Sequence, residues 1–202
     1  MTDKYQNKYR IPSARLQNWD YGWNAAYFVT ICTKDMDHYF GEIRDGVMDL
    51  SEIGKIVQTE WLKTPEIRPD MNLELGSSML MPNHFHGIIT IGENEYNTPM
   101  TDDGRDAMHR VSTTTTTATI TDTTYKNAFA PQSKNLASII RGFKSAVTKT
   151  ARQIHADFVW QSRFHDHIIR DEKSFYTISE YIQNNPLKWA DDKFYSEEKI
   201  AI

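Results

Sequence analysis

Length, composition and charge exclude several classes of protein. The chain has 202 residues, of which 39% are hydrophobic and 25% charged, as in one folded domain rather than a disordered or fibrous chain. It contains no apolar run of the ~18 residues that cross a bilayer, and the stretch after Met1 lacks a signal-peptide core, so we expect a cytoplasmic protein without a membrane partner. The single cysteine, Cys32, excludes a disulfide framework, and the net charge of −4 means that any nucleic-acid binding must come from a local basic patch.

The first part of the chain predicts a strand, a hairpin and a helix. Residues 27–33 are β-branched and aromatic, which is typical of a strand. Residues 41–50 predict a short hairpin that turns at its Asp-Gly pair. Ser51 is a good N-cap for a helix over 52–63, whose apolar residues recur at helical spacing.

The middle of the chain predicts two strands and an insertion. Strands over 73–81 and 84–91 are separated by a Pro-Asn turn. The segment 93–133 has few aliphatic residues and a run of threonines at 113–117, so it buries too little apolar surface to offset its ordering entropy. We predict a mobile insertion there, inside a single domain over 1–202, because neither flanking part looks self-sufficient.

The last part of the chain is mainly helical. Residues 134–152 predict a helix, 158–160 and 164–169 two short strands, and 171–184 a helix that Pro186 ends. The order strand, helix, two strands, helix, strand, helix predicts an α+β fold. Its nearest common architecture is a ferredoxin-like antiparallel sheet with helices packed on one face.

Two histidine pairs are candidate metal ligands. Side chains two residues apart on a strand share one face, so His84 and His86 present two imidazoles side by side, and imidazole binds several divalent ions. His165 and His167 have the same spacing. Geometry from the sequence does not choose between the pairs, and a polar strand face without a metal explains either one.

The last predicted helix adds a tyrosine and an amide. Tyr181 and Asn185 lie about one turn apart at the edge of its apolar stripe, so both can reach one spot on a neighbouring sheet. A boundary tyrosine and a helix-ending asparagine without any catalytic role account for the same pattern.

Four segments occur in an order that resembles a known family: YFVTICTKDMDHYFGEI, MPNHFHGIITI, LASIIRGFKSAVTK and VWQSRFHDHIIRDEKSFYTISEYIQNNPLKW. They resemble the single-tyrosine HUH transposases of bacterial insertion sequences, and especially the REP-associated tyrosine transposases. The resemblance covers about residues 10–189 without the insertion. The segments MPNHFHGI and YI-x-x-NP are specific in combination, whereas either one alone is not.

The resemblance implies a role for each matching residue. His84 and His86 match the histidines that bind Mg²⁺ or Mn²⁺, Asn185 matches the third metal ligand, and Tyr181 matches the nucleophile. The implied activity is cleavage and rejoining of single-stranded or hairpin DNA through a 5′-phosphotyrosine intermediate, by a monomer or a homodimer. A binding protein for the same DNA without turnover, and a metal-dependent hydrolase that uses water, are the alternatives.

The basic residues of the C-terminal half are candidate DNA contacts. Segment 134–170 has seven basic and two acidic residues, a net charge of +5, whereas 93–125 has six acidic and two basic residues. A basic helix face can track a nucleic-acid backbone, although a solvated charged face looks the same in sequence. The candidates are Lys134, Arg141, Lys144, Lys149, Arg152, Arg163 and Arg170.

Overall fold

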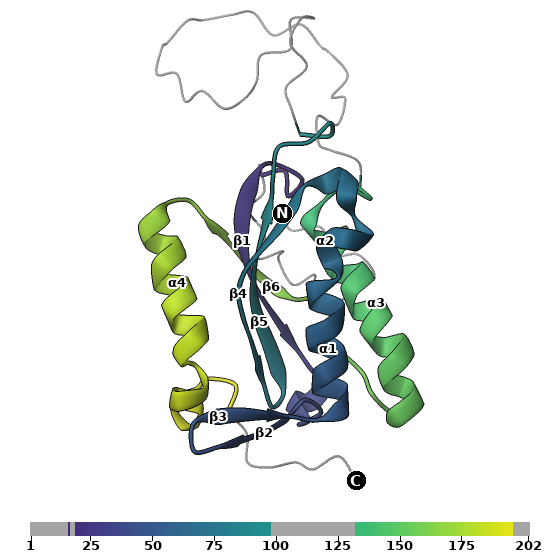
Figure 1. Cartoon of the computed structure of the whole chain (residues 1–202), viewed down its shortest axis with the longest axis vertical. Coiled ribbons are helices and arrows are strands. Elements are labelled where there is room, and N and C mark those ends of the chain that lie inside the picture. Colours follow the sequence, from purple (N-terminus) through teal and green to yellow (C-terminus); the bar gives the residue numbers. More distant parts are fainter. Residues whose placement is uncertain (1–15, 17–18, 98–131, 196–202) are drawn as a thin grey trace, which may run out of the picture.

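A four-stranded antiparallel sheet forms the centre of the molecule (Figure 1). The computed structural model describes residue 16 and residues 19–97 and 132–195. When the four strands of this sheet are numbered by their order along the chain, they follow one another across the sheet as 2-3-1-4, which is the ferredoxin-like order. The sheet order is β4 (Leu73–Met81), β5 (His84–Ile91), β1 (Ala25–Cys32) and β6 (His165–Ile169).

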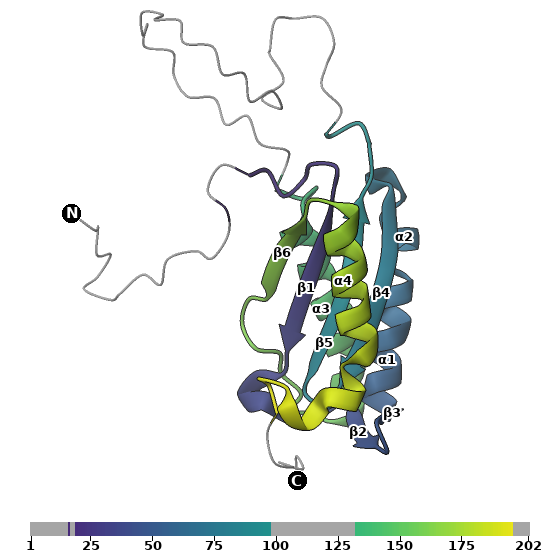
Figure 2. The same cartoon turned by 90° about the vertical axis from the view of Figure 1, so that its left-hand side faces the viewer.

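The helices lie on both faces of this sheet. The helices α1 (Glu52–Leu62) and α3 (Leu136–Ile154) cover one face, and α4 (Glu172–Asn184) lies against the opposite face (Figures 1 and 2). The α+β fold class with an antiparallel sheet is confirmed. The prediction placed the helices on one face, and α1 and α3 do share a face. The position of α4 differs from that expectation, because its apolar stripe around Ile182 packs on a second, smaller core.

Alternation along the strands builds the two cores. On β5, Phe85 and Ile89 point into the large core under α1 and α3, while His86 and Ile88 point to the α4 side. Gly87 gives Trp61 of α1 room to pack closely, since a Cβ there would lie 2.8 Å from the indole ring. The histidines therefore face α4 because their neighbours in sequence are needed in the main core.

Short elements join these main ones. The strands β2 (Gly41–Arg44) and β3 (Val47–Leu50) form the predicted hairpin, with positive φ at both Asp45 and Gly46, as a two-residue type I′ turn requires. The remaining elements are α2 (Thr64–Ile67) and three 3₁₀ turns, η2 (Lys34–Met36), η3 (Pro69–Met71) and η4 (Pro186–Asp191).

The other predicted elements agree closely with the structure, with one exception. Ser51 caps α1 by accepting from the Gly54 amide, and α3 begins two residues later than predicted because Asn135 and Ser138 form a capping box. The predicted strand 158–160 is wrong: only Trp160 forms an isolated bridge, with Thr33. Most of the predicted insertion lies outside the described residues, and no described helix is long and apolar enough to span a membrane.

Candidate active site

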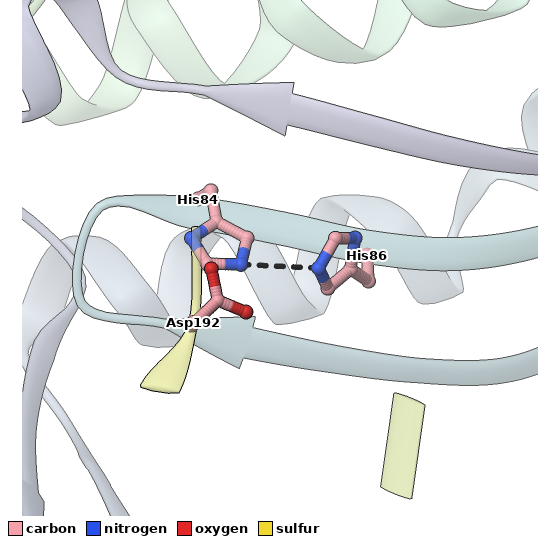
Figure 3. A group of neighbouring side chains, drawn as sticks. All are labelled: His84, His86 and Asp192. Carbon is pink, nitrogen blue, oxygen red and sulfur yellow. Dashed lines mark hydrogen bonds between the residues drawn. The ribbon is translucent and has the colours of Figure 1, made fainter. Parts of the chain in front are cut away.

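The candidate site begins with two buried histidines on the α4 side of β5. His84 and His86 are 0% and 1% exposed, and their Nε2 atoms lie 3.1 Å apart (Figure 3). Burial lowers the pKa of His84 well below its usual value and lowers that of His86 to about 3. Both rings are therefore neutral at pH 7, which is the protonation state that binds a metal.

Asn83 fixes the orientation of His84. Its side-chain Nδ2 donates to the carbonyls of Met36 and Phe194, so its Oδ1 faces the ring and accepts from His84 Nδ1 at 2.8 Å. With its proton on Nδ1, His84 presents a lone pair at Nε2. This outer partner prepares the ring as a ligand.

Thr30 plays the corresponding part for His86. Its Oγ1 lies 2.9 Å from His86 Nδ1, because Thr30 on β1 is the register partner of His86 on β5. A hydroxyl both donates and accepts, so it stabilises either tautomer. With the proton on Nε2, His86 donates to His84; with the proton on Nδ1, both Nε2 lone pairs are free to bind one cation.

Asp192 is a third potential ligand. One ligand atom from each of His84, His86 and Asp192 lies within 4.8 Å of the others (Figure 3). The turn η4, which follows α4, brings the chain back so that Asp192 reaches the histidines. Two imidazoles and a carboxylate suit a divalent ion of borderline hardness.

Asn185 adds an independent sign of a missing partner. The residue is 2% exposed, yet among the described residues neither polar atom of its side chain makes a hydrogen bond of normal geometry, although Asn185 is close enough to the Tyr181 hydroxyl to lower its pKa. A buried amide without partners costs about 1–3 kcal/mol. Asn185 shares a cavity with Asp192, so a cation in this region would give its Oδ1 the partner it lacks.

Tyr181 places a hydroxyl beside the histidines. This side chain is 43% exposed, and its oxygen lies 3.4 Å from His86 Nε2. Its ring packs edge-on against Phe28 of β1. Burial, and then the charge of Asp192, raise the pKa of Tyr181, so the phenol stays protonated at neutral pH.

A cavity of about 540 Å³ opens beside this group. It is large enough to admit a small organic group such as a nucleotide. Its lining residues come from the end of α4 and from the segment after it: Glu180, Tyr181, Asn184, Asn185, Lys188, Asp191, Asp192 and Lys193.

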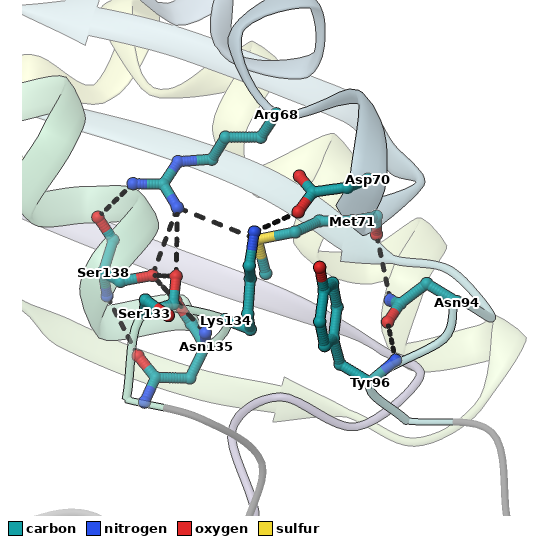
Figure 4. Close-up of polar contacts among 9 residues, drawn as sticks. All are labelled: Arg68, Asp70, Met71, Asn94, Tyr96, Ser133, Lys134, Asn135 and Ser138. Carbon is teal, nitrogen blue, oxygen red and sulfur yellow. Dashed lines mark hydrogen bonds and ion pairs between the residues drawn. The ribbon is translucent and has the colours of Figure 1, made fainter.

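The structure brings the predicted histidines and tyrosine together but leaves most predicted basic residues elsewhere. Lys134, Arg141, Lys144, Lys149 and Arg152 belong to α3 or directly precede it, on the other face of the sheet. Lys134 forms an ion pair with Asp70 at the start of α3 (Figure 4). The Lys144 ammonium donates to the carbonyls of Gln161 and Arg163, so it already holds a loop.

Sequence reasoning missed three residues of the site. Asp192 lies outside every periodic element, and only η4 returns it to the histidines. Asn83 lies in the predicted turn, but its side chain has a second role in orienting His84. Thr30 belongs to the site only because strand register places it opposite His86, and no local sequence pattern predicts that register.

Comparisons with known proteins show the fold and a family. No family model matches the chain. A REP-associated tyrosine transposase bound to a REP hairpin has a similar structure, with a TM-score of 0.50 and 16% identity over 87% of this chain and 73% of that one. At this identity the likeness shows a shared, transposase-like fold.

One sequence relative is much more similar. An uncharacterized protein from Haemophilus influenzae is 36% identical over 203 aligned residues, which cover 96% of this chain and 99% of the relative. The two chains therefore match over nearly their whole lengths, and this chain belongs to the same family as that uncharacterized protein.

Proposed function

We propose that this protein is a DNA transposase that cleaves and rejoins single-stranded DNA through Tyr181. The observation that carries the proposal is the 3.4 Å distance between the Tyr181 hydroxyl and Nε2 of His86, the ring that faces His84. A nucleophile beside a set of metal ligands is the arrangement that phosphoryl transfer requires. The shared fold with a REP-associated tyrosine transposase supports the same assignment.

The proposed metal ligands are His84, His86 and Asn185, to which the structure adds Asp192. Mg²⁺ or Mn²⁺ is the proposed ion, and Mn²⁺ suits the imidazole content better because Mg²⁺ prefers oxygen ligands. Bound there, such an ion would neutralise charge on the non-bridging oxygens of the phosphodiester that the tyrosine attacks.

The proposed reaction keeps the energy of the broken bond. The Tyr181 oxygen attacks phosphorus, the phosphorus–O3′ bond breaks, and the phenol proton leaves as the 3′ oxygen gains one. The products are a 5′-phosphotyrosine link and a free 3′-hydroxyl. Attack of a 3′-hydroxyl on that link rejoins DNA without ATP and releases Tyr181.

Single-stranded or hairpin DNA is the proposed partner. The structural neighbour is bound to a REP hairpin, and we extend that class of ligand to this chain. Arg163 and Arg170 flank β6 next to the site, and Lys149 and Arg152 line a second cavity of about 540 Å³ beside Trp160, on the α3 side of the sheet. These basic residues are the proposed contacts to the DNA backbone.

A covalent-adduct assay tests the proposal. Labelled single-stranded oligonucleotides that tile the sequences flanking the gene are incubated with the protein and Mn²⁺, then separated under denaturing conditions. We expect a protein–DNA adduct that EDTA and Tyr181→Phe abolish. Tyr176→Phe is the matched control, because Tyr176 is an exposed tyrosine on the same helix and lies one and a half turns away.

Two other outcomes would replace this function. Binding of the oligonucleotide without any adduct, with either wild type or control, indicates a non-catalytic DNA-binding protein. Cleavage that survives Tyr181→Phe indicates a hydrolase that uses water as the nucleophile.

A further inference from the structure

The second histidine pair, His165 and His167, lies on the same face of the sheet as the candidate site. Thr30 of β1 pairs with His86 of β5 on one side and with His165 of β6 on the other. Phe28, which Tyr181 contacts, pairs with His167. The first row places His165 two strand spacings, about 10 Å, from His86, and the second places His167 one strand spacing from the ring that Tyr181 contacts.

The pair stands open to solvent beside α4. Both imidazoles are exposed, whereas those of His84 and His86 are buried. Figure 2 shows α4 in front of the sheet and β6 uncovered to its left. A ligand at Tyr181 can therefore extend over β1 to the edge strand without displacing a helix.

Two exposed arginines lie next to this part of the sheet. Asp166, the acidic residue of β6, belongs to the opposite face, where its charge acts on Tyr27. Arg163 and Arg170, both exposed, directly flank the strand region. The imidazole N–H groups donate to phosphate oxygens whether the rings are neutral or charged.

A second metal site is not the better explanation. Within the described residues, His84, His86 and Asp192 form a group of three potential ligands, and His165 and His167 join no such group. Hydrogen-bond donors spaced along an open strip suit an extended polyanion instead.

We infer that His165 and His167 bind the backbone of single-stranded DNA next to the phosphodiester that Tyr181 attacks. This inference rests on the proposed function and assigns the second histidine pair to substrate binding. The strand would pass from the cavity at the end of α4, across Tyr181, to the β6 edge. The pair then sets the position of the strand without taking part in bond breaking.

The test separates binding from chemistry. The probe is the oligonucleotide that forms the adduct with wild type, and its affinity is measured in EDTA for wild type and for the double variant His165→Gln/His167→Gln. We expect an affinity about tenfold weaker in the double variant, as for the loss of one or two hydrogen bonds to phosphate. The single-turnover rate of adduct formation at saturating DNA stays unchanged. His155→Gln, a histidine on the α3 side, is the matched control.

A second measurement shows whether the contact is direct. Each phosphodiester of the probe is replaced in turn by an uncharged methylphosphonate. With wild type, one or two positions adjacent to the cleaved bond lower the affinity, and the double variant is insensitive at those same positions. Because both histidines are exposed, the variant is expected to fold as wild type does.

Two outcomes overturn the inference. Equal affinities and equal interference patterns show that the pair does not touch the DNA. An unchanged affinity with a slower saturated rate shows that the pair acts in the chemistry instead. The proposed function fails separately, if wild type binds an oligonucleotide but forms no adduct; the bound oligonucleotide is then the probe, and the affinity of the double variant still decides whether the pair contacts DNA.

Discussion

At the scale of single residues, the site depends on the partners that orient its two histidines. His84 is oriented by Asn83, whose own amide group is held by two carbonyls, and His86 by the hydroxyl of Thr30. Such outer partners determine ring orientation and tautomer, and their loss lowers metal affinity by about 10–100-fold. A substitution of Thr30 therefore tests the effect of such a partner on metal affinity, since it leaves every candidate ligand in place.

Thr30→Val is predicted to weaken metal binding while the fold is retained. Valine has nearly the shape of threonine but cannot accept the Nδ1 proton of His86, so the tautomer with a free Nε2 becomes less favourable. We expect the affinity for Mn²⁺, measured by calorimetry, to fall about 10–100-fold. Thr90→Val on β5, remote from the histidines, serves as the control. An unchanged affinity in Thr30→Val would rule out this role.

At the scale of elements, the position of β6 is set by a contact from the other face of the sheet. Lys144 of α3 donates to the carbonyls of Gln161 and Arg163, in the loop that leads into β6. Arg163 has a φ of 69°, in the left-handed region, so this loop is under local backbone strain that the lysine helps to hold. Lys144, a candidate DNA contact in the sequence, therefore has a structural role in holding this loop.

Lys144→Met is predicted to loosen this loop. Removing two hydrogen bonds to main-chain carbonyls lowers the free energy of unfolding by about 1–2 kcal/mol and speeds amide hydrogen exchange in residues 161–165. Lys149→Met, which removes an exposed lysine of the same helix, is expected to change stability by less than about 0.5 kcal/mol. Identical exchange in the two variants would show that Lys144 does not hold the loop.

At the scale of the whole molecule, burying two neutral histidines makes folding sensitive to acid. The unfolded chain binds protons at His84 and His86 as the pH falls below about 6.5. The native protein does not bind them in this range, because the pKa of His86 in the fold is about 3. The contribution of the neutral rings to the free energy of unfolding is therefore fully present above about pH 6.5 and is lost as the pH falls. Each histidine contributes up to about 1.4 kcal/mol per pH unit.

Urea unfolding in EDTA between about pH 7 and pH 5 measures this loss. We expect the free energy of unfolding to fall with pH in wild type and to fall less steeply in His86→Gln. A wild-type protein equally stable at both ends of the range would contradict the burial of neutral rings.

Much of this protein was predictable from local pattern. The helices around Ser51 and Asp171 and the strand pair on either side of Pro82 follow from capping residues, periodicity and turn residues, which act over a few positions. The histidine spacing on β5 also determined that both rings share a face. These features are local, so the sequence by itself determined them, together with the α+β class.

Only the tertiary structure decided which groups meet. Tyr181 lies 95 positions from His86, and Asp192 reaches the pair through a 3₁₀ turn with no periodic signal. Strand register across β1 brought Thr30 to one histidine pair and aligned the other pair beside the same site. The physical reason is that register and helix placement come from burying apolar faces across the whole domain. The position of α4 on the face opposite α1 and α3 is the clearest case, since its apolar stripe alone fits either face.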